Sequence, residues 1–365
     1  MNARALALAV LLGAVSAAAA GCGGKHQLHG DVLITAARLF DGTHFESPGR
    51  LLVRDGKVIG VGPSLAAKAK RTIRLRDATI LPGFIDLHVH TEAGMVEGGD
   101  TTVRNLGAPL SALRPPSRQL GPLVLMAGPL VSVSGGYPET VWGPSIALDV
   151  RSPADARAAV RMLARRGAAV IKVALDPGHG AWPMLSVAEV RAIVAEAHAQ
   201  RLRVTAHAMG VEGVRRALAG GVDELAHTPC GATPDQIREI LRRHLPFVAT
   251  LHVEELVDGG CLGVARQLIA GGDLPLYGTD VGNAGIPLGI DVRELQLMHE
   301  AGMTPPQVLA AATSRAGAEL GRSPLGSLVT GAPADVVVVH GDARVLSNES
   351  ARLLVMSRGN VIIAP

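Results

Sequence analysis

Eight short apolar segments, each followed by loop signals or a helical pattern, constrain the fold of this chain most strongly. They cover residues 81–90, 101–106, 122–131, 169–175, 203–208, 223–228, 246–252 and 274–280. Strands that alternate with helices favour a parallel sheet, because each helix carries the chain back to start the next strand in the same direction. Eight such units predict an α/β fold with a (β/α)8 barrel over residues 81–320.

Three helix starts between or after these segments carry a capping pattern, in which a hydroxyl residue precedes the helix and Glu or Gln follows three positions later. The patterns are Ser186-x-x-Glu189, Thr233-Pro234-x-Gln236 and Thr304-Pro305-x-Gln307. They are structural signals and carry no function.

Both ends of the chain have the patterns of short strands. Residues 51–61 form a predicted hairpin with Asp55-Gly56 at its tip, and residues 72–76 alternate strictly. Strand patterns return at residues 334–339 and 353–362. We therefore predict that the termini jointly form one small β-sandwich, with residues 23–80 as its N-terminal part and residues 321–365 as its C-terminal part.

Residues 1–22 have the pattern of a targeting segment. Arg4 precedes an uncharged Ala/Leu/Val stretch that is too short for a comfortable membrane span. Its end, Ala19-Ala20-Gly21-Cys22, resembles a bacterial lipobox, although Leu is usual where Ala19 stands. We predict an exported protein that touches a bacterial membrane only through a lipid anchor on Cys22, on the periplasmic or cell-surface side. A plain secretory signal is the alternative.

Two cysteines remain beyond Cys22, namely Cys230 and Cys261. In an oxidising compartment they could pair, and two buried free thiols are the alternative. The sequence leaves both open because it does not show how far apart the two residues lie.

The charge balance gives no support for nucleic-acid binding. The chain has 35 Lys and Arg against 32 Asp and Glu, a net charge of +3, and no basic run with interleaved aromatic residues. We expect a small-molecule substrate as the partner. The oligomeric state, the physiological metal and the substrate's identity are left open by the sequence.

His88 and His90 end the first apolar segment and point to the same face of a strand, because side chains two positions apart do so. Two adjacent imidazoles suit a divalent transition metal. The alternative is that His88 and His90 are two surface histidines that bind no metal. It is disfavoured because polar residues end later segments in turn: Lys172, His207, His227 and Asp280.

The chain resembles the amidohydrolase superfamily of metal-dependent hydrolases, in particular its imidazolonepropionase-like and prolidase-like members. The likeness covers about residues 30–365. It rests on these motifs: Pro82-Gly83-Phe84-Ile85-Asp86-Leu87-His88-Val89-His90, Thr101-Thr102-Val103-Arg104-Asn105-Leu106-Gly107, Val170-Ile171-Lys172-Val173, His207-Ala208, Ala219-Gly220-Gly221-Val222-Asp223-Glu224-Leu225-Ala226-His227, Gly278-Thr279-Asp280 and Gly331-Ala332-Pro333-Ala334-Asp335.

The resemblance implies two divalent ions, zinc by default, at the C-terminal mouth of the barrel. His88, His90 and Asp280 would hold one ion, while His207 and His227 would hold the other. Lys172 would bridge them as a carbamate, because a plain ammonium cannot ligate a cation; a structural ion pair is its alternative role. Asp280 would also be catalytic, as the group that takes a proton from the attacking water. Asp86 is interpreted as a supporting residue, not as a ligand.

One departure from the family concerns the first barrel helix. Only residues 91–100 separate the His-x-His segment from Thr101, where the family has a long loop and a helix. We expect a compact barrel whose first helix is short or missing.

Aromatic and histidine residues on the predicted loops are candidates for substrate binding. Tyr137, Trp142, His179 and His252 form this group, and Trp182 lies on the same loops. Ordinary loop packing for the aromatic residues, and local hydrogen bonding for the histidines, are the structural alternatives.

Three functions are compatible with these residues. The first is hydrolysis of an amide bond, in a dipeptide or a small cyclic or acylated amine, at a two-metal site. The second is a mononuclear deaminase on the same barrel, which needs a Glu shortly after His207, whereas no carboxylate precedes Glu212. The third is a lipoprotein that binds a ligand without turnover, and the complete set of candidate ligands argues against it.

Overall fold

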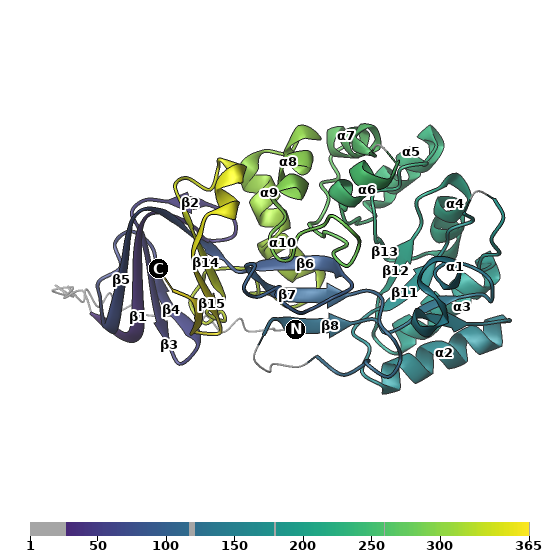
Figure 1. The fold of residues 1–365 in the computed structure, drawn as a ribbon, viewed down its shortest axis with the longest axis horizontal. Coiled ribbons are helices and arrows are strands. Elements are labelled where there is room, and N and C mark those ends of the chain that lie inside the picture. The colour runs from purple at the N-terminus through teal and green to yellow at the C-terminus, as the bar shows by residue number, and fades with distance from the viewer. Residues whose placement is uncertain (1–26, 117–120, 179, 259, 365) are drawn as a thin grey trace, which may run out of the picture.

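The computed structural model describes residues 27–116, 121–178, 180–258 and 260–364. A sheet built from both ends of the chain lies at one end of the molecule, and an α/β body lies at the other (Figure 1). No helix of the described residues is long and apolar enough to cross a membrane.

The terminal sheet has eight strands, in the order β16-β15-β14-β5-β1-β3-β4 with β2 beside β1. The N-terminal strands are β1 (Leu28–Phe40), β2 (Phe45–Glu46), β3 (Gly49–Arg54), β4 (Lys57–Val61) and β5 (Ala67–Pro82). The C-terminal strands are β14 (Val336–His340), β15 (Arg352–Ser357) and β16 (Asn360–Ile363). Antiparallel pairing of β14 with β5, from Val336↔Pro82 to His340↔Ala78, joins the two ends of the chain.

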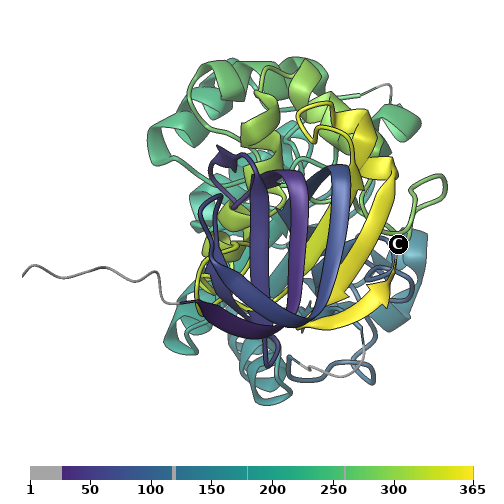
Figure 2. The same ribbon diagram turned by 90° about the vertical axis from the view of Figure 1, so that its left-hand side faces the viewer.

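One continuous sheet therefore holds the strands of both termini. It curls over so that Ile34 and Leu51 share an apolar core with Val338 and Met356 (Figure 2). The hairpin predicted at Asp55-Gly56 joins β3 to β4. Both residues have positive φ, 50° and 72°, as a two-residue turn between right-twisted strands requires.

The four valines of β14 fix this sheet to the rest of the molecule. Val336 and Val338 pack into the core of the curled sheet, whereas Val337 and Val339 pack against Met298 and neighbouring side chains of the helices behind it. All four valines are fully buried. Successive side chains of a strand point to opposite faces, and a different core covers each face of β14. This explains why four apolar residues follow one another without a polar residue between them.

The α/β body contains two parallel sheets. One has β6 (Phe84–Val89), β7 (Asp100–Asn105) and β8 (Leu123–Met126), in that order. The other has the order β10-β9-β11-β12-β13, with β9 (Leu130–Ser132), β10 (Ala147–Asp149), β11 (Ile171–Ala174), β12 (Val204–His207) and β13 (Glu224–Leu225). The strand predicted at 122–131 is thus two strands, separated at Gly128, whose φ is +79°.

The last two predicted strands are wrong in extent. Segments 246–252 and 274–280 pair only through single parallel bridges, Leu225↔Phe247 and Val248↔Leu276. Thr250 and Asp280 adopt positive φ, 46° and 58°, which ends an extended strand at these points. Helix α6 begins immediately after Thr250.

Ten α-helices and two short 3-10 turns occur in the described residues. The helices are α1 (Glu139–Trp142), α2 (Pro153–Arg165), α3 (Val187–Ala199), α4 (Val211–Gly220), α5 (Pro234–Arg243), α6 (Leu251–Asp258), α7 (Leu262–Ala270), α8 (Val292–Glu300), α9 (Pro305–Ala311) and α10 (Ser314–Glu319). The turns are Pro144–Ile146 and Leu346–Ser350. The capping boxes predicted at Ser186, Thr233 and Thr304 are all confirmed.

Residues 91–99, between β6 and β7, form turns without a helix, as the short spacing predicts. The sequence did not predict that the connection from β7 to β8 also lacks a helix over its described residues, 106–116 and 121–122. Two successive connections of the body therefore contain no helix in their described residues.

A buried ion pair joins the two sheets of the body. Arg104 on β7 donates from Nη2 to Glu224 Oε1 at 2.6 Å and from Nη1 to Glu224 Oε2 at 3.2 Å. Its Nε donates to the Leu87 carbonyl, and Thr205 Oγ1 donates to Glu224. Burial acts to raise the pKa of Glu224, but Arg104 outweighs burial and keeps that pKa below its ordinary value.

We predict that Glu224→Ala destabilises the protein by about 3–5 kcal/mol, because it leaves the Arg104 guanidinium buried without its partner. Urea unfolding followed by circular dichroism measures this. Glu239→Ala removes ion pairs with Arg242 and Arg243 on exposed helix α5 and should change the midpoint little. Equal effects of the two variants would contradict the assignment of Glu224 as a core ion-pair partner.

Candidate active site

The six predicted ligands come together in one pocket at the carboxyl ends of the body's strands. His88 and Lys172 lie within β6 and β11, His207 ends β12, and His90, His227 and Asp280 follow strand segments directly. All six line the pocket, together with Leu130, Tyr137, Pro138, Trp142, Ile146 and Asn283. Strands β6, β7 and β8 run away from the terminal sheet, so their carboxyl ends face away from that sheet (Figure 1).

His88, His90 and Asp280 form the first half of the site. The Oδ1 atom of Asp280 lies 3.3 Å from His88 Nε2 and 3.0 Å from His90 Nε2. The backbone N–H of Asp280 donates to the His88 carbonyl at 2.8 Å, and this bond holds the carboxylate beside the His-x-His strand.

His207 and His227 form the second half. Nδ1 of His207 lies 2.9 Å from Nε2 of His227, and the rings meet edge to face. The rings of His227 and His88 are 4.5 Å apart, so the two halves adjoin. Lys172 lines the same pocket, with its Nζ 3.4 Å from His88 Nε2.

Each of the four imidazoles uses its other nitrogen to bind the protein. The partners are Ala226 O for His88 Nδ1 (2.8 Å), Gly107 O for His90 Nδ1 (3.3 Å), Asp176 Oδ2 for His207 Nε2 (3.2 Å) and Thr250 Oγ1 for His227 Nδ1 (3.0 Å). These bonds fix each ring's orientation. One nitrogen of each ring is left pointing into the pocket, as in metal sites where ligating histidines donate their second N–H to the protein.

Burial sets the charge state of these groups. It lowers the pKa values of His88, His207 and His227, so the rings are neutral and offer a lone pair near neutral pH. Burial also lowers the pKa of Lys172 to about 7, although the Asp280 carboxylate acts in the opposite direction. Burial acts to raise the pKa of Asp280, but the neighbouring His90 outweighs it and lowers that pKa.

The donor set fits a divalent metal ion. Ligand atoms of His88, His227 and Asp280 lie within 4.8 Å of one another, and all three residues are buried. Asp280 Oδ1 is buried and has no hydrogen-bond partner of normal geometry among the described residues, despite the two ring nitrogens beside it. A cation among these atoms would satisfy them together, and nitrogen with carboxylate ligation suits zinc and similar metals.

Asp86 supports the site from behind, as the sequence suggested. It accepts the backbone N–H of His88 at 2.9 Å and the hydroxyl of Thr279 at 2.6 Å. Burial raises the pKa of Asp86 to about 7, although the hydrogen bonds from Thr279 and His88 act against it. Asp86 thereby connects β6 to the segment that carries Asp280.

The predicted substrate-binding residues have different positions. Tyr137 stacks on His207 with a centroid distance of 4.3 Å, and Trp142 stacks on His90 at 6.3 Å. His252 does not line the pocket: it lies on α6, where its Nδ1 is 2.6 Å from Asp291 Oδ2. The prediction for His252 assumed a strand end, and the helical turn after Thr250 directs the ring elsewhere. His179 lies outside the described residues.

Sequence analysis missed three residues that hold the second pair of histidines. Asp176 and Thr250 bind His207 and His227 directly, and the buried Glu254 lies 3.8 Å from His227 Nδ1. A signal was available for Asp176 and Thr250, because each follows an apolar segment at the same end of the sheet as the ligands. Glu254 lies on α6, and only the fold brings it close.

Comparison with known proteins decides the family. The model of the "Amidohydrolase family" matches residues 79–362, which include all six candidate ligands. The chain belongs to the amidohydrolase family. This confirms the resemblance drawn from the motifs.

Three proteins illustrate where this amidohydrolase lies within the family. It is 30% identical to an ochratoxinase of Aspergillus niger over 224 residues, which cover 54% of this chain and 46% of that protein. It is 25% identical to an imidazolonepropionase of Symbiobacterium thermophilum over 364 residues, covering 80% and 83% of the two chains. The structure of a Xaa-Pro dipeptidase with bound methionine superposes with a TM-score of 0.81 at 23% identity, covering 91% of this chain and all of that one.

A disulfide joins Cys230, which follows closely after His227 in the chain, to Cys261. The Cα atoms are 4.9 Å apart, and 31 positions separate the two residues along the chain. Cys230 follows the His227 strand end, and Cys261 precedes α7. The disulfide answers the question that the sequence left open, and it ties the His227 loop to the segment that carries Thr250 and Glu254.

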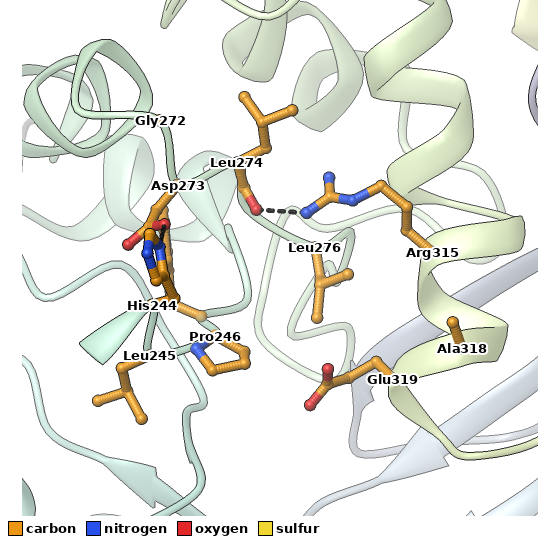
Figure 3. A pocket seen from close by; sticks show the side chains of 11 residues that line it. His244, Leu245, Pro246, Gly272, Asp273, Leu274, Leu276, Arg315, Ala318 and Glu319 are labelled. Carbon is orange, nitrogen blue, oxygen red and sulfur yellow. Dashed lines mark hydrogen bonds and ion pairs between the residues drawn. The ribbon is translucent and has the colours of Figure 1, made fainter. Parts of the chain in front are cut away.

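A larger hollow of about 540 Å³ lies at the opposite, amino end of the strand segments. Figure 3 shows Arg315 on α10 facing it, with a hydrogen bond from its guanidinium to the Leu274 carbonyl. His244 and Asp273 form an ion pair at its edge. None of the six candidate ligands lines it, so size alone does not identify the active site of this amidohydrolase.

We predict that the double variant Cys230→Ser/Cys261→Ser is less stable by about 2–4 kcal/mol, because the unfolded chain loses the constraint of a closed loop. Thermal unfolding with and without a reductant measures this. Reductant should lower the melting temperature of the native protein to that of the variant and leave the variant unchanged. A native melting temperature that is insensitive to the reductant would show that the pair does not stabilise the fold.

Proposed function

We propose that this amidohydrolase cleaves an amide bond in a small substrate, such as a dipeptide or cyclic amide, by attack of water at a binuclear site bridged by carboxylated Lys172. One observation carries the proposal. Four imidazole nitrogens, the Asp280 carboxylate and the Lys172 amine converge at the carboxyl ends of the body's strands.

Two divalent ions, zinc by default, would be held by His88, His90 and Asp280 on one side and by His207 and His227 on the other, with Lys172 between them. When bound, such ions lower the pKa of water and polarise the scissile carbonyl. Asp280 is the group placed to accept the proton of the attacking water and to return it to the leaving nitrogen, because its Oδ1 faces the pocket without a hydrogen-bond partner of normal geometry.

The surroundings of Lys172 support its role as a bridge. Lys172 is 1% exposed, and its Nζ lies 3.4 Å from His88 Nε2. A charged ammonium at this distance would repel a metal ion bound by His88. Burial brings the pKa of Lys172 to about 7, so much of the amine is neutral near that pH. A neutral amine can add carbon dioxide, and the resulting carbamate has two oxygens and one negative charge to share between two cations.

The walls of the pocket favour a small substrate with an apolar or aromatic portion. Leu130, Pro138 and Ile146 supply apolar surface, and Tyr137 and Trp142 stack on two of the histidines. Among similar proteins, one solved structure is a Xaa-Pro dipeptidase, which supports a dipeptide-sized substrate.

We also infer that the two parallel sheets and the later segments form one closed (β/α)8 barrel. The parallel bridges of Leu225 with Phe247 and of Val248 with Leu276 support this, as does the hydrogen bond from Leu87 N to Tyr277 O. On the other side, Ala169 N donates to Met126 O and links β8 to the segment that leads into β11.

The deaminase alternative requires a Glu shortly after His207 in the chain that faces the substrate. The first carboxylate after His207 is Glu212, on the solvent side of helix α4. Its oxygens lie 2.6 Å from Arg215 and 2.7 Å from Arg216, so it is committed to pairs on the helix surface. Its position supports the hydrolase over the deaminase, and membership of a hydrolase family argues against a binding protein without turnover.

The location of the protein stays a prediction. We propose export and lipid anchoring at Cys22, on the pattern of residues 1–22, which lie outside the described residues. Cys22→Ala should release the protein from membranes that are washed in about 0.5 M salt, which screens other charge contacts with the lipid, and immunoblotting of cell fractions measures this. Native protein found in the cytoplasm would contradict export.

We predict that Lys172→Ala, reconstituted with zinc and bicarbonate, holds fewer than the two ions per chain of the native protein and loses at least about 100-fold in activity, because the bridge between the ions is gone. Elemental analysis measures the ions, and product profiling with a dipeptide and lactone library measures activity. A short carboxylic acid such as propionate should partly restore Lys172→Ala by filling the gap.

Lys172→Met is the matched control, because it fills the same space without a ligand and leaves no room for the acid. Two retained ions and a near-native rate in Lys172→Ala would refute the bridge and favour a mononuclear mechanism. Native protein that binds one ion or none under these conditions would refute the binuclear site itself.

We predict that Asp280→Asn retains much of the metal and loses about 10²–10⁴-fold in kcat, because the amide cannot accept a proton. Metal content and steady-state rates on the same preparation separate the two effects. A rate that falls only in proportion to the metal lost would show that Asp280 acts as a ligand alone.

A further inference from the structure

We propose that the outward face of the terminal sheet docks onto a bilayer surface that carries anionic phospholipids. The face lies at the end of the molecule farthest from the α/β body, and Figure 2 looks directly onto its strands. We call it the basic face, and it consists of Arg54, Lys57, Lys68, Lys70, Arg74 and Arg76, all exposed.

Strand register places these six cations together. On β5, positions 68, 70, 74 and 76 share one side, and Ile73 on the opposite side is buried in the core of the curled sheet. The ion pair between Lys70 and Asp31, at 2.8 Å, shows that the outward sides of β5 and β1 coincide. Arg54 and Lys57 are direct partners across β3 and β4.

The charge of the basic face is unusual for this chain. Six cations stand against two carboxylates, Asp31 and Asp55, which is a net charge of +4, whereas the whole chain has +3. No carboxylate of the described residues pairs with Lys57, Lys68, Arg74 or Arg76. By contrast, Arg215, Arg242 and Arg293 pair with Glu residues of helices. Unpaired cations on one face of the sheet attract an anionic membrane, and each cation near the membrane strengthens binding roughly fivefold.

The start of the described chain points to the same surface. β1 begins at Leu28, which pairs with Ala67, and His29 pairs with Lys68. Only five residues separate Leu28 from Cys22, so the chain can reach at most about 20 Å from a lipid on Cys22 to β1. A lipid there would hold the basic face near the headgroups, and one lipid chain with a basic surface anchors more stably than either alone.

The test measures binding of the chain from Gly23 to Pro365, which contains every described residue, to sedimented vesicles. It compares vesicles of phosphatidylcholine with about one third phosphatidylglycerol against pure phosphatidylcholine. We expect binding to the anionic vesicles only, and its loss in about 0.5 M salt, where charges are screened within a few ångströms. Because the probe lacks Cys22, this outcome does not depend on lipidation or on catalysis.

The variant Lys68→Glu/Lys70→Glu/Arg74→Glu/Arg76→Glu should bind anionic vesicles at least about 100-fold more weakly. The matched control, Arg151→Glu/Arg157→Glu/Arg165→Glu/Arg166→Glu, reverses four exposed cations at or beside α2 and should bind as the native chain does. Circular dichroism confirms that both variants are folded.

Three results would overturn the proposal. The first is no binding to anionic vesicles at low salt. The cations would then serve only to discourage pairing of this sheet's edges with another chain. The second is an equal loss in the control variant, which would show a nonspecific effect of net charge. The third is tighter binding to duplex DNA than to the vesicles, which would assign the face to a nucleic acid.

Discussion

Four imidazole rings in this amidohydrolase each bind the protein through one nitrogen, and the whole site depends on these four hydrogen bonds. A free imidazole could turn either nitrogen to a cation. With Ala226, Gly107, Asp176 and Thr250 as fixed acceptors, only one nitrogen of each ring is left for the pocket. Two of these acceptors are backbone carbonyls in the loops that follow β7 and β13, so the backbone itself orients His88 and His90.

The site is costly to fold because so many of its polar groups are buried. Arg104 and Glu224 offset part of that cost, because two hydrogen bonds join the guanidinium to the carboxylate. Asp86 likewise accepts hydrogen bonds from the His88 backbone N–H and the Thr279 hydroxyl, which satisfies these buried groups. In each of these two groups the loss of one partner would leave the others buried and unsatisfied.

Sequence reasoning located the ligands because each of them interrupts or ends an apolar run. Lys172 is the clearest case, since a charged residue inside Val170-Ile171-Lys172-Val173 needs a reason to be buried. It failed at Thr250, where left-handed backbone ends a strand that hydrophobicity alone would continue. The misplacement of His252 followed from the same turn.

Contacts that depend on tertiary distance were beyond the sequence. Cys230 and Cys261 could pair or stay free until the fold set their Cα atoms 4.9 Å apart. Glu254 approaches His227 only because α6 starts directly after Thr250. The curl of the terminal sheet was likewise invisible, since the pattern of β14 shows burial on both faces but not which core covers each face.

The joining of β5 to β14 has a consequence for the order in which the molecule assembles. Thr79 donates a hydrogen bond to the carbonyl of Gly341, 262 positions later in the chain. A chain that emerges from its N-terminus onward completes the α/β body before the partner of β5 exists, so β5 waits with an unpaired edge. Such a contact closes a very long loop, which makes it a late and slow step of folding. The C-terminal strands β14, β15 and β16 therefore pair last, and the fold is complete only when about the last thirty residues are in place.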